Sequence, residues 1–504
     1  MKYKENKKLK TRIIIFLIFI AGIVAALFIF NTLNIQNKKS NTYECKNCNV
    51  IFLDVDLLRA DHIGLLNKEY ENTTPNIDKF FRNGIIFKDV TAPVGATQVG
   101  NIAILTNTDP FIISNIVQTK YYDLNPESLK KPLITYSNKS EFSNYKNIFQ
   151  IFKKQNYTTI EINDGGFSGR NTFMDAGTDE YYEETFPEKK INEAFKQTTK
   201  KILELEKNSE ANTSNKKSFF LLMHSNNLHA MPYRYPNNRT HINNKEIVYL
   251  KKLGKDWYNI FFDFDKSHQP LTENKTINPV WLKRNYKKSF HIQWMNESIY
   301  QNFHKLSYEL YSQQLKFVDE QLGTIFNELE NDKNLLNNTI VVLYSNHGDG
   351  LLDNKILNHD VSYQSCIHVP ILIRYPNMKK SVIIKEPVAL LDLTPTIYAL
   401  LNITNPKNQT DYGLIPVLTG NKYDREYLFG TSGDRFVRKG DMKLIIFGAN
   451  LKELYNVTSD PKETNNLIKE YPQIAQELND ALEIHQITIA ARNNFKVNKL
   501  VRTT

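Results

Sequence analysis

The sequence predicts an α/β fold in which a mostly parallel β-sheet is sandwiched by helices, followed by a smaller C-terminal α+β subdomain. Short apolar runs alternate with helix-like stretches, and the clearest runs are residues 50–55, 219–223, 340–344 and 369–373. This alternation is typical of parallel sheets, whose crossover helices cover both faces. Several runs lead into Asp, Asn or His side chains, at the strand ends where open sheets bind ligands.

The N-terminal segment predicts a signal anchor. Residues 1–12 carry six basic side chains and one acid, and residues 13–30 are an uncharged apolar run. That run approaches the roughly 20 residues of a membrane span, and the positive-inside rule leaves residues 1–12 in the cytoplasm. We therefore expect a single-pass membrane protein with an extracytoplasmic catalytic domain. The alternative is a cleaved secretory peptide, which exports the domain equally.

Charge and cysteine content limit the partners of the chain. The formal net charge is +10 and residues 1–12 hold half of it, so composition does not support a nucleic-acid partner. Residues 31–48 form a polar linker, in which export permits a Cys45–Cys48 disulfide. A zinc ribbon would need a second cysteine pair, which the sequence lacks.

The catalytic domain is expected to span residues 49–384. Helix-like stretches at 147–154 and 308–329 separate its strands. The insert 232–298 is rich in Tyr, Trp, Asn and Lys without a clean period, which predicts a lid or substrate-facing loops. The C-terminal subdomain, residues 385–504, is predicted from four segments: helices at 393–401 and 472–485 and strand-like runs at 427–432 and 443–447.

Asp56 is the first candidate metal ligand, because it ends the apolar run 50–55. A carboxylate at the end of a buried strand is unfavourable unless it is paired or bound to a cation. Asp54 lies two residues earlier on the same strand face. It is therefore either a further ligand or a polar contact near the strand end.

Thr97 is the candidate nucleophile. It follows a loop that contains Pro93 and Gly95 and precedes the helix-like run 98–105. A hydroxyl at a helix N-terminus lies near free backbone N–H groups, which favour an anionic nucleophile and a bound oxyanion. Threonine is a weak nucleophile and needs a cation or base to stabilise its alkoxide. The alternative is that Thr97 is a simple N-cap.

A second group of possible ligands follows the run 340–344. Asn346 and His347 come directly after it, and Asp349 and His359 lie further on. Imidazole and carboxylate or carbonyl oxygen are common ligands of divalent cations. Two distant strand ends are therefore predicted to share one metal, although His347 and Asn346 are alternatively polar turn residues.

Seven short segments, in this order, resemble the motifs of the sulfatase family of the alkaline-phosphatase superfamily. A C-terminal signature at 453–467 extends the resemblance, which therefore covers residues 49–467. The seven segments are 56–62, 74–78, Thr97 with 105–106, 229–233, 318–323, 345–348 and 391–396.

The resemblance implies roles for individual residues. Asp56, Asn346 and His347 occupy the places of the ligands of one divalent metal ion, which would be Mn, Zn, Mg or Ca, and a second metal is possible. His229 resembles the histidine that hydrogen-bonds the ester oxygen and protonates the leaving group, and His359 one that contacts the metal or the oxyanion. His224 competes with His229 but lies inside a strand, and Arg59 is expected to form a structural salt bridge.

The chain departs from typical sulfatases at the nucleophile. The family pattern Cys/Ser-x-Pro-x-Arg, whose first residue becomes formylglycine, is replaced by Thr97, Val99 and Asn101. Formylglycine is therefore not expected. A sulfated threonine cannot expel sulfate by collapsing to a carbonyl, whereas phosphorus accepts a second in-line attack more readily. Asn346 also replaces an Asp, which removes one negative charge from the metal site.

These observations lead to two hypotheses. The first is a membrane-anchored, metal-dependent hydrolase or transferase of sulfate or phosphate esters, with Thr97 as nucleophile and phosphoryl chemistry favoured. Threonine at this position resembles the phosphodiesterases and the phosphoglycerol and phosphoethanolamine transferases of the superfamily. The alternative is a degenerate, non-catalytic member of the family that binds an envelope glycan or lipid, which Asn346 favours.

Overall fold

The computed structural model describes ten stretches of the chain: residues 43–114, 145–164, 175–183, 193–211, 217–230, 297–356, 359–406, 411, 413–448 and 451–493. Within these stretches, no helix combines the length and the apolar character that a membrane crossing needs. The predicted anchor at 13–30 and nearly all of the predicted lid at 232–298 lie outside them.

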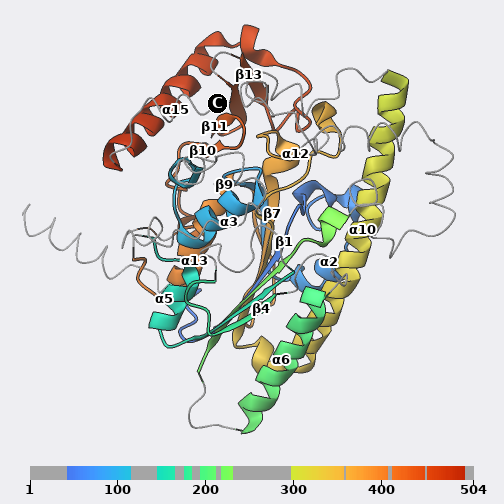
Figure 1. Ribbon diagram of the computed structural model, residues 1–504, viewed down its shortest axis with the longest axis vertical. Coiled ribbons are helices and arrows are strands. Elements are labelled where there is room, and N and C mark those ends of the chain that lie inside the picture. The colour runs from blue at the N-terminus through green and yellow to red at the C-terminus, as the bar shows by residue number, and fades with distance from the viewer. Residues whose placement is uncertain are drawn as a thin grey trace, which may run out of the picture. The chain divides into compact units, whose positions relative to one another are not determined.

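A large sheet forms the centre of the fold and confirms the predicted architecture. Its strand order is β4-β3-β5-β1-β6-β7-β2-β8, and β9 also pairs with β2 (Figure 1). All pairings are parallel except those of β7 with β6 and with β2. The strands are β1 Asn49–Val55, β2 Ile85–Thr91, β3 Thr158–Asn163, β4 Glu180–Glu183, β5 Phe219–Ser225, β6 Thr339–Tyr344, β7 His368–Arg374, β8 Val382–Ile384 and β9 Val388–Ala389.

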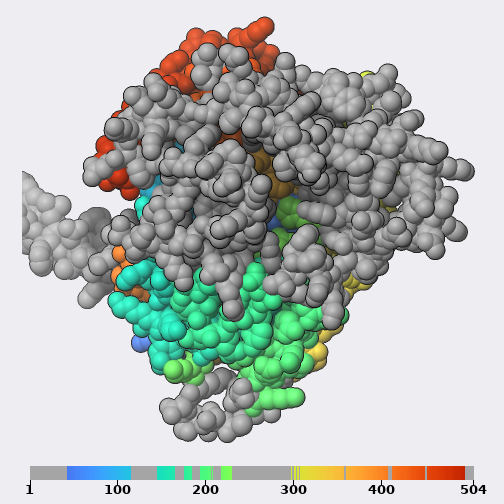
Figure 2. Space-filling view, viewed as in Figure 1, coloured from blue at the N-terminus to red at the C-terminus, as the bar shows by residue number. Residues whose placement is uncertain are grey.

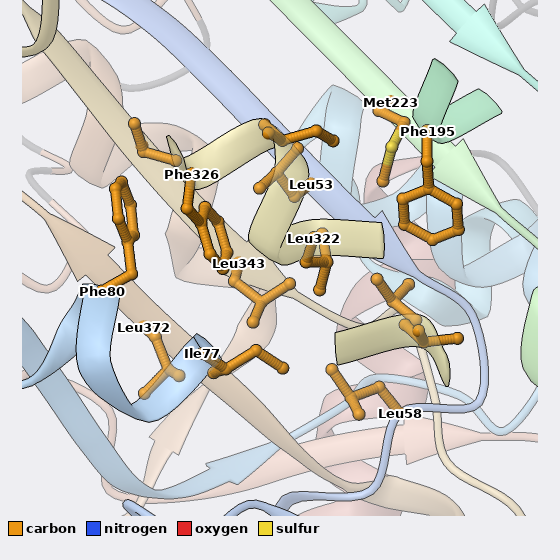
Figure 3. Packing of buried hydrophobic residues seen from close by; sticks show 14 of the residues in the cluster. Leu53, Leu58, Ile77, Phe80, Phe195, Met223, Leu322, Phe326, Leu343 and Leu372 are labelled. Carbon is orange, nitrogen blue, oxygen red and sulfur yellow. The ribbon is translucent and has the colours of Figure 1, made fainter. Parts of the chain in front are cut away.

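One face of this sheet packs against three helices: α2 (Pro75–Phe81), α6 (Glu193–Ala211) and α10 (Glu297–Asn331). Phe80 of α2 stacks on Phe326 of α10 with ring centroids 4.1 Å apart, and both rings lie above the sheet (Figure 3). The apolar positions of α10 recur with helical spacing, so that one stripe of this long helix faces the sheet.

The opposite face is covered by α3 (Thr97–Thr106), α5 (Ile148–Lys154) and α13 (Leu393–Leu400), as Figure 1 shows. Phe152 of α5 stacks on Phe220 of β5 with centroids 4.6 Å apart. Four side chains that are register partners on neighbouring parallel strands form a row of polar residues across this face, closer to the carboxyl ends of the strands than Phe220. This polar row consists of Asn163, His224, Asp54 and Tyr344 on β3, β5, β1 and β6.

A second, antiparallel sheet forms the C-terminal part, as predicted. Its strands are β10 Leu428–Thr431, β11 Arg435–Lys439, β12 Met442–Phe447 and β13 Leu451–Asn456. The helix α15 (Pro472–Arg492) packs on it through Leu478 and Leu482. In the space-filling view, α15 lies in red at the end of the molecule opposite the green of α6 (Figure 2).

The expected division at residue 385 does not coincide with the start of this second sheet. Val388 of β9 pairs with Val90 of β2, so this part of the chain still belongs to the large sheet. Thr394 of α13 donates its hydroxyl to the carbonyl of Ile104 at 2.7 Å, which ties α13 to α3. The antiparallel sheet begins only at Leu428.

Short elements complete the described fold. Cys45 and Cys48, the predicted pair, are both disulfide-bonded, and Cys366 is a buried free thiol. The short α-helices are α11 Lys333–Leu336, α12 Gln364–Ile367 and α14 Ile415–Leu418, and the 3-10 turns are Ala60–His62, Lys68–Tyr70, Asn227–Ala230, Asp353–Lys355, Leu390–Asp392 and Leu467–Lys469.

Candidate active site

The carboxyl ends of β1, β5 and β6 and the N-terminus of α3 bring the predicted site residues together. Asp56 directly follows β1, and its backbone N–H donates to the carbonyl of Ser225 at the end of β5. Thr97 is the first residue of α3, and His347 follows β6 by three residues. All three functional side chains are buried. Neighbouring parallel strands end at one edge of the sheet, which explains this convergence.

The hydroxyl of Thr97 lies between a carboxylate and an imidazole. Its Oγ1 is 3.0 Å from Oδ2 of Asp56 and 3.0 Å from Nε2 of His347. The N-cap of α3 is Ala96, so Thr97 is not the N-cap that the alternative interpretation requires. The hydroxyl has one proton to donate, and it can therefore satisfy only one of its two neighbours as a donor.

The hydrogen bonds of His347 indicate its tautomer. Nδ1 lies 2.8 Å from the carbonyl oxygen of Gly348 and must donate to it. In the neutral ring, Nε2 is then an acceptor that faces Thr97 and lies 3.4 Å from Oδ1 of Asp56. Several lone pairs thus converge on one buried point, an arrangement that is stable only when a proton or a cation lies among them.

The pKa shifts agree with this arrangement. Burial lowers the pKa of His347, although Asp56 opposes the effect, so the ring is neutral. Burial raises the pKa of Asp56, but His347 and His229 more than offset this and hold it well below its usual value. We therefore treat Asp56 as an anion.

His229 and His359 lie beside this centre. Nε2 of His229 is 2.9 Å from Oδ2 of Asp56. The ring of His359 lies 4.6 Å from that of His347 and 5.4 Å from that of His229, and its Nδ1 is 3.1 Å from the carbonyl oxygen of Gly95. The structure thus places His229 against Asp56 and the ring of His359 beside that of His347, and Asp56 and His347 are the two side chains that contact the Thr97 hydroxyl.

Asn346 is held by Asp54. Its backbone N–H and its Nδ2 donate to Oδ1 and Oδ2 of Asp54, both at 3.2 Å. Nδ1 of His224 lies 2.7 Å from Oδ2 of Asp54, and Nε2 lies 3.2 Å from Oδ1 of Asn226. His224 is therefore a core residue paired with Asp54, and not the competitor of His229 that its sequence position allowed.

The residues present fit a divalent cation. Oδ1 of Asp56 and Oδ1 of Asn346 are buried and accept no hydrogen bond within the described residues. Together with Nε2 of His347 they are two oxygens and one nitrogen, a donor set compatible with Mn, Zn, Mg or Ca. Among the described residues, no three His, Cys, Asp or Glu side chains lie close enough together to bind a metal ion. The donor set therefore depends on the amide oxygen of Asn346.

Arg59 takes the structural role expected for it. Its guanidinium is buried and forms ion pairs with Asp61 at 2.6 Å and Asp353 at 2.8 Å, and it donates to the carbonyl of Asp349 at 3.1 Å. Asp349, one of the possible ligands in the sequence, is also buried. Arg59 thus supports the loop that follows His347 and lies outside the candidate site.

The support for the two active-site loops was not predicted. Oγ of Ser432 accepts from the N–H of Gly95 at 2.7 Å, and the N–H of Thr431 donates to the carbonyl of Pro93. Asp434 accepts from the N–H of Ser362 at 3.0 Å. These contacts join segments more than 70 residues apart, and no local pattern in the sequence reveals such contacts.

Comparisons with known proteins found related sequences and related folds. A family model described as Sulfatase matches residues 48–403, and one described as N-sulphoglucosamine sulphohydrolase, C-terminal, matches residues 352–488. Arylsulfatase K of Homo sapiens is 24% identical over 277 residues, which cover 50% of this chain and 49% of that protein. Delta 4,5-hexuronate-2-O-sulfatase of Bacteroides thetaiotaomicron is 30% identical over 183 residues, or 32% and 37% of the two chains.

The chain thus aligns with a third to a half of the length of these curated relatives. Two solved structures share the fold over most of both chains. A candidate sulfatase from Bacteroides fragilis has a TM-score of 0.60 at 17% identity, covering 90% of this chain and 98% of that one. A 2-O GAG sulfatase has a TM-score of 0.55 at 19% identity, covering 90% and 94%.

Proposed function

The chain belongs to the sulfatase family, and from this premise we propose that it is a metal-dependent enzyme that cleaves or transfers a sulfate or phosphate ester through Thr97. One observation carries the proposal: the hydroxyl of Thr97 lies at 3.0 Å from both Asp56 and His347, at the first turn of a helix. A nucleophile within reach of a base, with backbone N–H groups beside it, is the arrangement that such chemistry needs.

Asp56, Asn346 and His347 are the residues that would hold the metal. A divalent cation there would lower the pKa of the Thr97 hydroxyl and neutralise the charge of the ester. The donor set is compatible with Mn, Zn, Mg or Ca, and a second metal is also compatible with the proposal. The imidazole of His347 favours Mn or Zn over Ca.

Asp56 and His229 carry out the proton transfers of the proposed reaction. Asp56 accepts the Thr97 proton along their hydrogen bond while Oγ1 forms a bond to the phosphorus or sulfur of the ester. The bond from that atom to the ester oxygen breaks, and His229 gives the departing oxygen its proton. Water or an acceptor alcohol then attacks the same atom and loses its proton to His229. The bond from that atom to Oγ1 breaks, and Thr97 takes its proton back from Asp56. His359 lies beside His229 and orients the oxyanion.

Phosphoryl chemistry is favoured over sulfuryl chemistry in this proposal. The side chain of Thr97 has no aldehyde hydrate that could collapse and expel the group, so the second step must be an attack on the central atom. Phosphorus accepts such an attack more readily than sulfur. The names of relatives that act on hexuronate and glycosaminoglycan sulfates support a charged saccharide as the molecule that carries the ester.

The predicted anchor and exported domain complete the proposal. With residues 13–30 in the membrane, the substrate would be an ester on an envelope glycan or lipid. A second function, binding of such a glycan or lipid without turnover, is favoured by one observation. Asn346 stands where the family has an Asp, which weakens binding of a hard divalent cation.

An activity assay separates these functions. We expect the full-length chain to hydrolyse bis-p-nitrophenyl phosphate with Mn or Zn, and p-nitrophenyl sulfate more slowly. Thr97→Ala should lower kcat by about 10³-fold or more, because the covalent step is lost. Thr97→Ser is the matched control and should retain activity. Activity that survives Thr97→Ala would refute the nucleophile, and inertness with every metal and both esters would favour the binding function.

A further inference from the structure

The polar row on the sheet contains a carboxylate for which the proposed reaction has no use. Asp54 is 1% exposed, lies on β1 two residues before Asp56, and contacts neither Thr97 nor His347 among the described interactions. A buried carboxylate at such a place is unfavourable without partners. Its partners are His224 on one side and Asn346 on the other.

The contacts of Asp54 decide which atom of Asn346 points away from it. An asparagine amide can bind a cation only through its oxygen, yet its two orientations differ only by exchange of Oδ1 and Nδ2. A carboxylate accepts hydrogen bonds and does not donate them, so Nδ2 must face Asp54, as observed at 3.2 Å. Oδ1 is then directed elsewhere, and it is a buried oxygen that accepts no hydrogen bond among the described residues.

His224 keeps Asp54 in this acceptor role. Both ring nitrogens of His224 face oxygens, Nδ1 that of Asp54 at 2.7 Å and Nε2 that of Asn226 at 3.2 Å. A carboxylate cannot donate, so Nδ1 donates to Asp54, and Oδ2 of Asp54 accepts from both His224 and Asn346.

We propose that Asp54, supported by His224, is a positioning residue that fixes the amide of Asn346 so that Oδ1 serves as a metal ligand. The inference rests on the proposed function, since Asn346 is one of the residues proposed there to hold the cation. It explains how an amide works at a position that resembles an Asp of other sulfatases. An Asp offers oxygens in either orientation, whereas an Asn must be oriented by a neighbour.

The test is a titration of Mn²⁺ alone into the chelator-treated full-length chain, followed by calorimetry. Asp54→Asn keeps the volume but lets residue 54 donate to Oδ1 of Asn346, which reverses the amide. We expect its Mn²⁺ affinity to fall by about 10- to 100-fold, as for other residues that orient metal ligands. The double variant Asp54→Asn with Asn346→Asp should recover most of this loss, because a carboxylate needs no orientation.

The matched control is Glu161→Gln, which also replaces a buried carboxyl on the same sheet face by an amide but makes no contact with Asn346 among the described interactions. Its Mn²⁺ affinity should equal that of the wild type. Equal affinity in Asp54→Asn, or a loss that the double variant does not recover, would overturn the positioning role while leaving the metal site intact. Absence of Mn²⁺ binding by the wild type would overturn both the metal site and this role.

Discussion

The chemistry of this site depends on single protons shared between neighbouring side chains. Thr97 has one proton and two acceptors at 3.0 Å, and the bond from His347 to the carbonyl of Gly348 makes its other nitrogen an acceptor. Asp56 is an anion, because its histidine neighbours together more than offset the effect of burial and hold its pKa well below its usual value. Asp56 and His347 can thus accept the proton of the Thr97 hydroxyl, and a cation at this place would stabilise the alkoxide that forms.

A substitution at His229 tests its role as proton donor. His229→Asn should lower kcat by about 10²- to 10⁴-fold for an ester with a poor leaving group such as an alkyl alcohol. The effect should be much smaller for p-nitrophenol, which departs without a proton. Rates measured for both esters check this difference, and an equal loss for the two leaving groups would contradict the assignment.

The buried Glu161 should make stability depend on pH. Burial raises its pKa to about 8 from an ordinary value of 4.5, so the folded state binds more protons than the unfolded state between these values. Stability contributed by the neutral carboxyl is therefore lost as pH rises through this window. Glu161→Gln should be more stable than the wild type at pH 8, by up to about 4 kcal/mol, and the difference should vanish near pH 4. Urea unfolding at both pH values measures it.

At the scale of elements, the turn between β10 and β11 connects the C-terminal sheet to the two active-site loops. The N–H of Asp360 donates to the carbonyl of Gly95, so the loop that carries His359 runs beside the loop that precedes Thr97. A Cβ at Gly95 would lie 2.7 Å from the carbonyl oxygen of Val361, which explains why only glycine fits there. Ser432 then ties this pair of loops to the second sheet.

Removal of the Ser432 hydroxyl should therefore disturb the site more than the fold. Ser432→Ala leaves the N–H of Gly95 without its acceptor at 2.7 Å, and the loss is expected to be about 1 kcal/mol. We expect lower kcat, because Thr97 and His359 shift. Thr458→Ala removes a comparable bond at an exposed position and is the control. Unchanged kcat in Ser432→Ala would show that the turn does not position the loops.

At the scale of the whole molecule, the site is built on a sheet whose two faces are covered by different helices. The helices α2, α6 and α10 cover one face, and α3 with Thr97 covers the other (Figure 1). The packing of the first face therefore supports the strands that carry Asp56 and His347 without contacting those side chains. Such an arrangement separates stability from chemistry.

A core substitution on the first face tests this separation. Phe326→Ala removes the ring that stacks on Phe80 and should lower the free energy of unfolding by about 3–5 kcal/mol. Below the unfolding transition, Mn²⁺ affinity should stay within about twofold of the wild type. Denaturant unfolding and calorimetry measure the two quantities, and a large loss of affinity at full folding would show that the two faces are coupled.

The sequence by itself determined the strands that carry the chemistry and the residues at their ends. Asp56 and Asn346 follow apolar runs, and the carboxyl ends of neighbouring parallel strands lie at one edge of a sheet. The helix after Thr97 was also predictable, since residues 102–105 are apolar and residues 98–105 contain no proline. Weaker segments such as β8 and β9 were missed, because two or three residues carry no period.

Only the tertiary structure decided how the side chains share their protons and partners. The sequence left Asp54 as either a ligand or a polar contact, and the register of β1 between β5 and β6 places it between His224 and Asn346. The support from Ser432 likewise depends on a contact across 337 positions of the chain. Hydrogen bonds are decided by distances of a few ångströms, and local sequence patterns contain no information on which distant segments come that close.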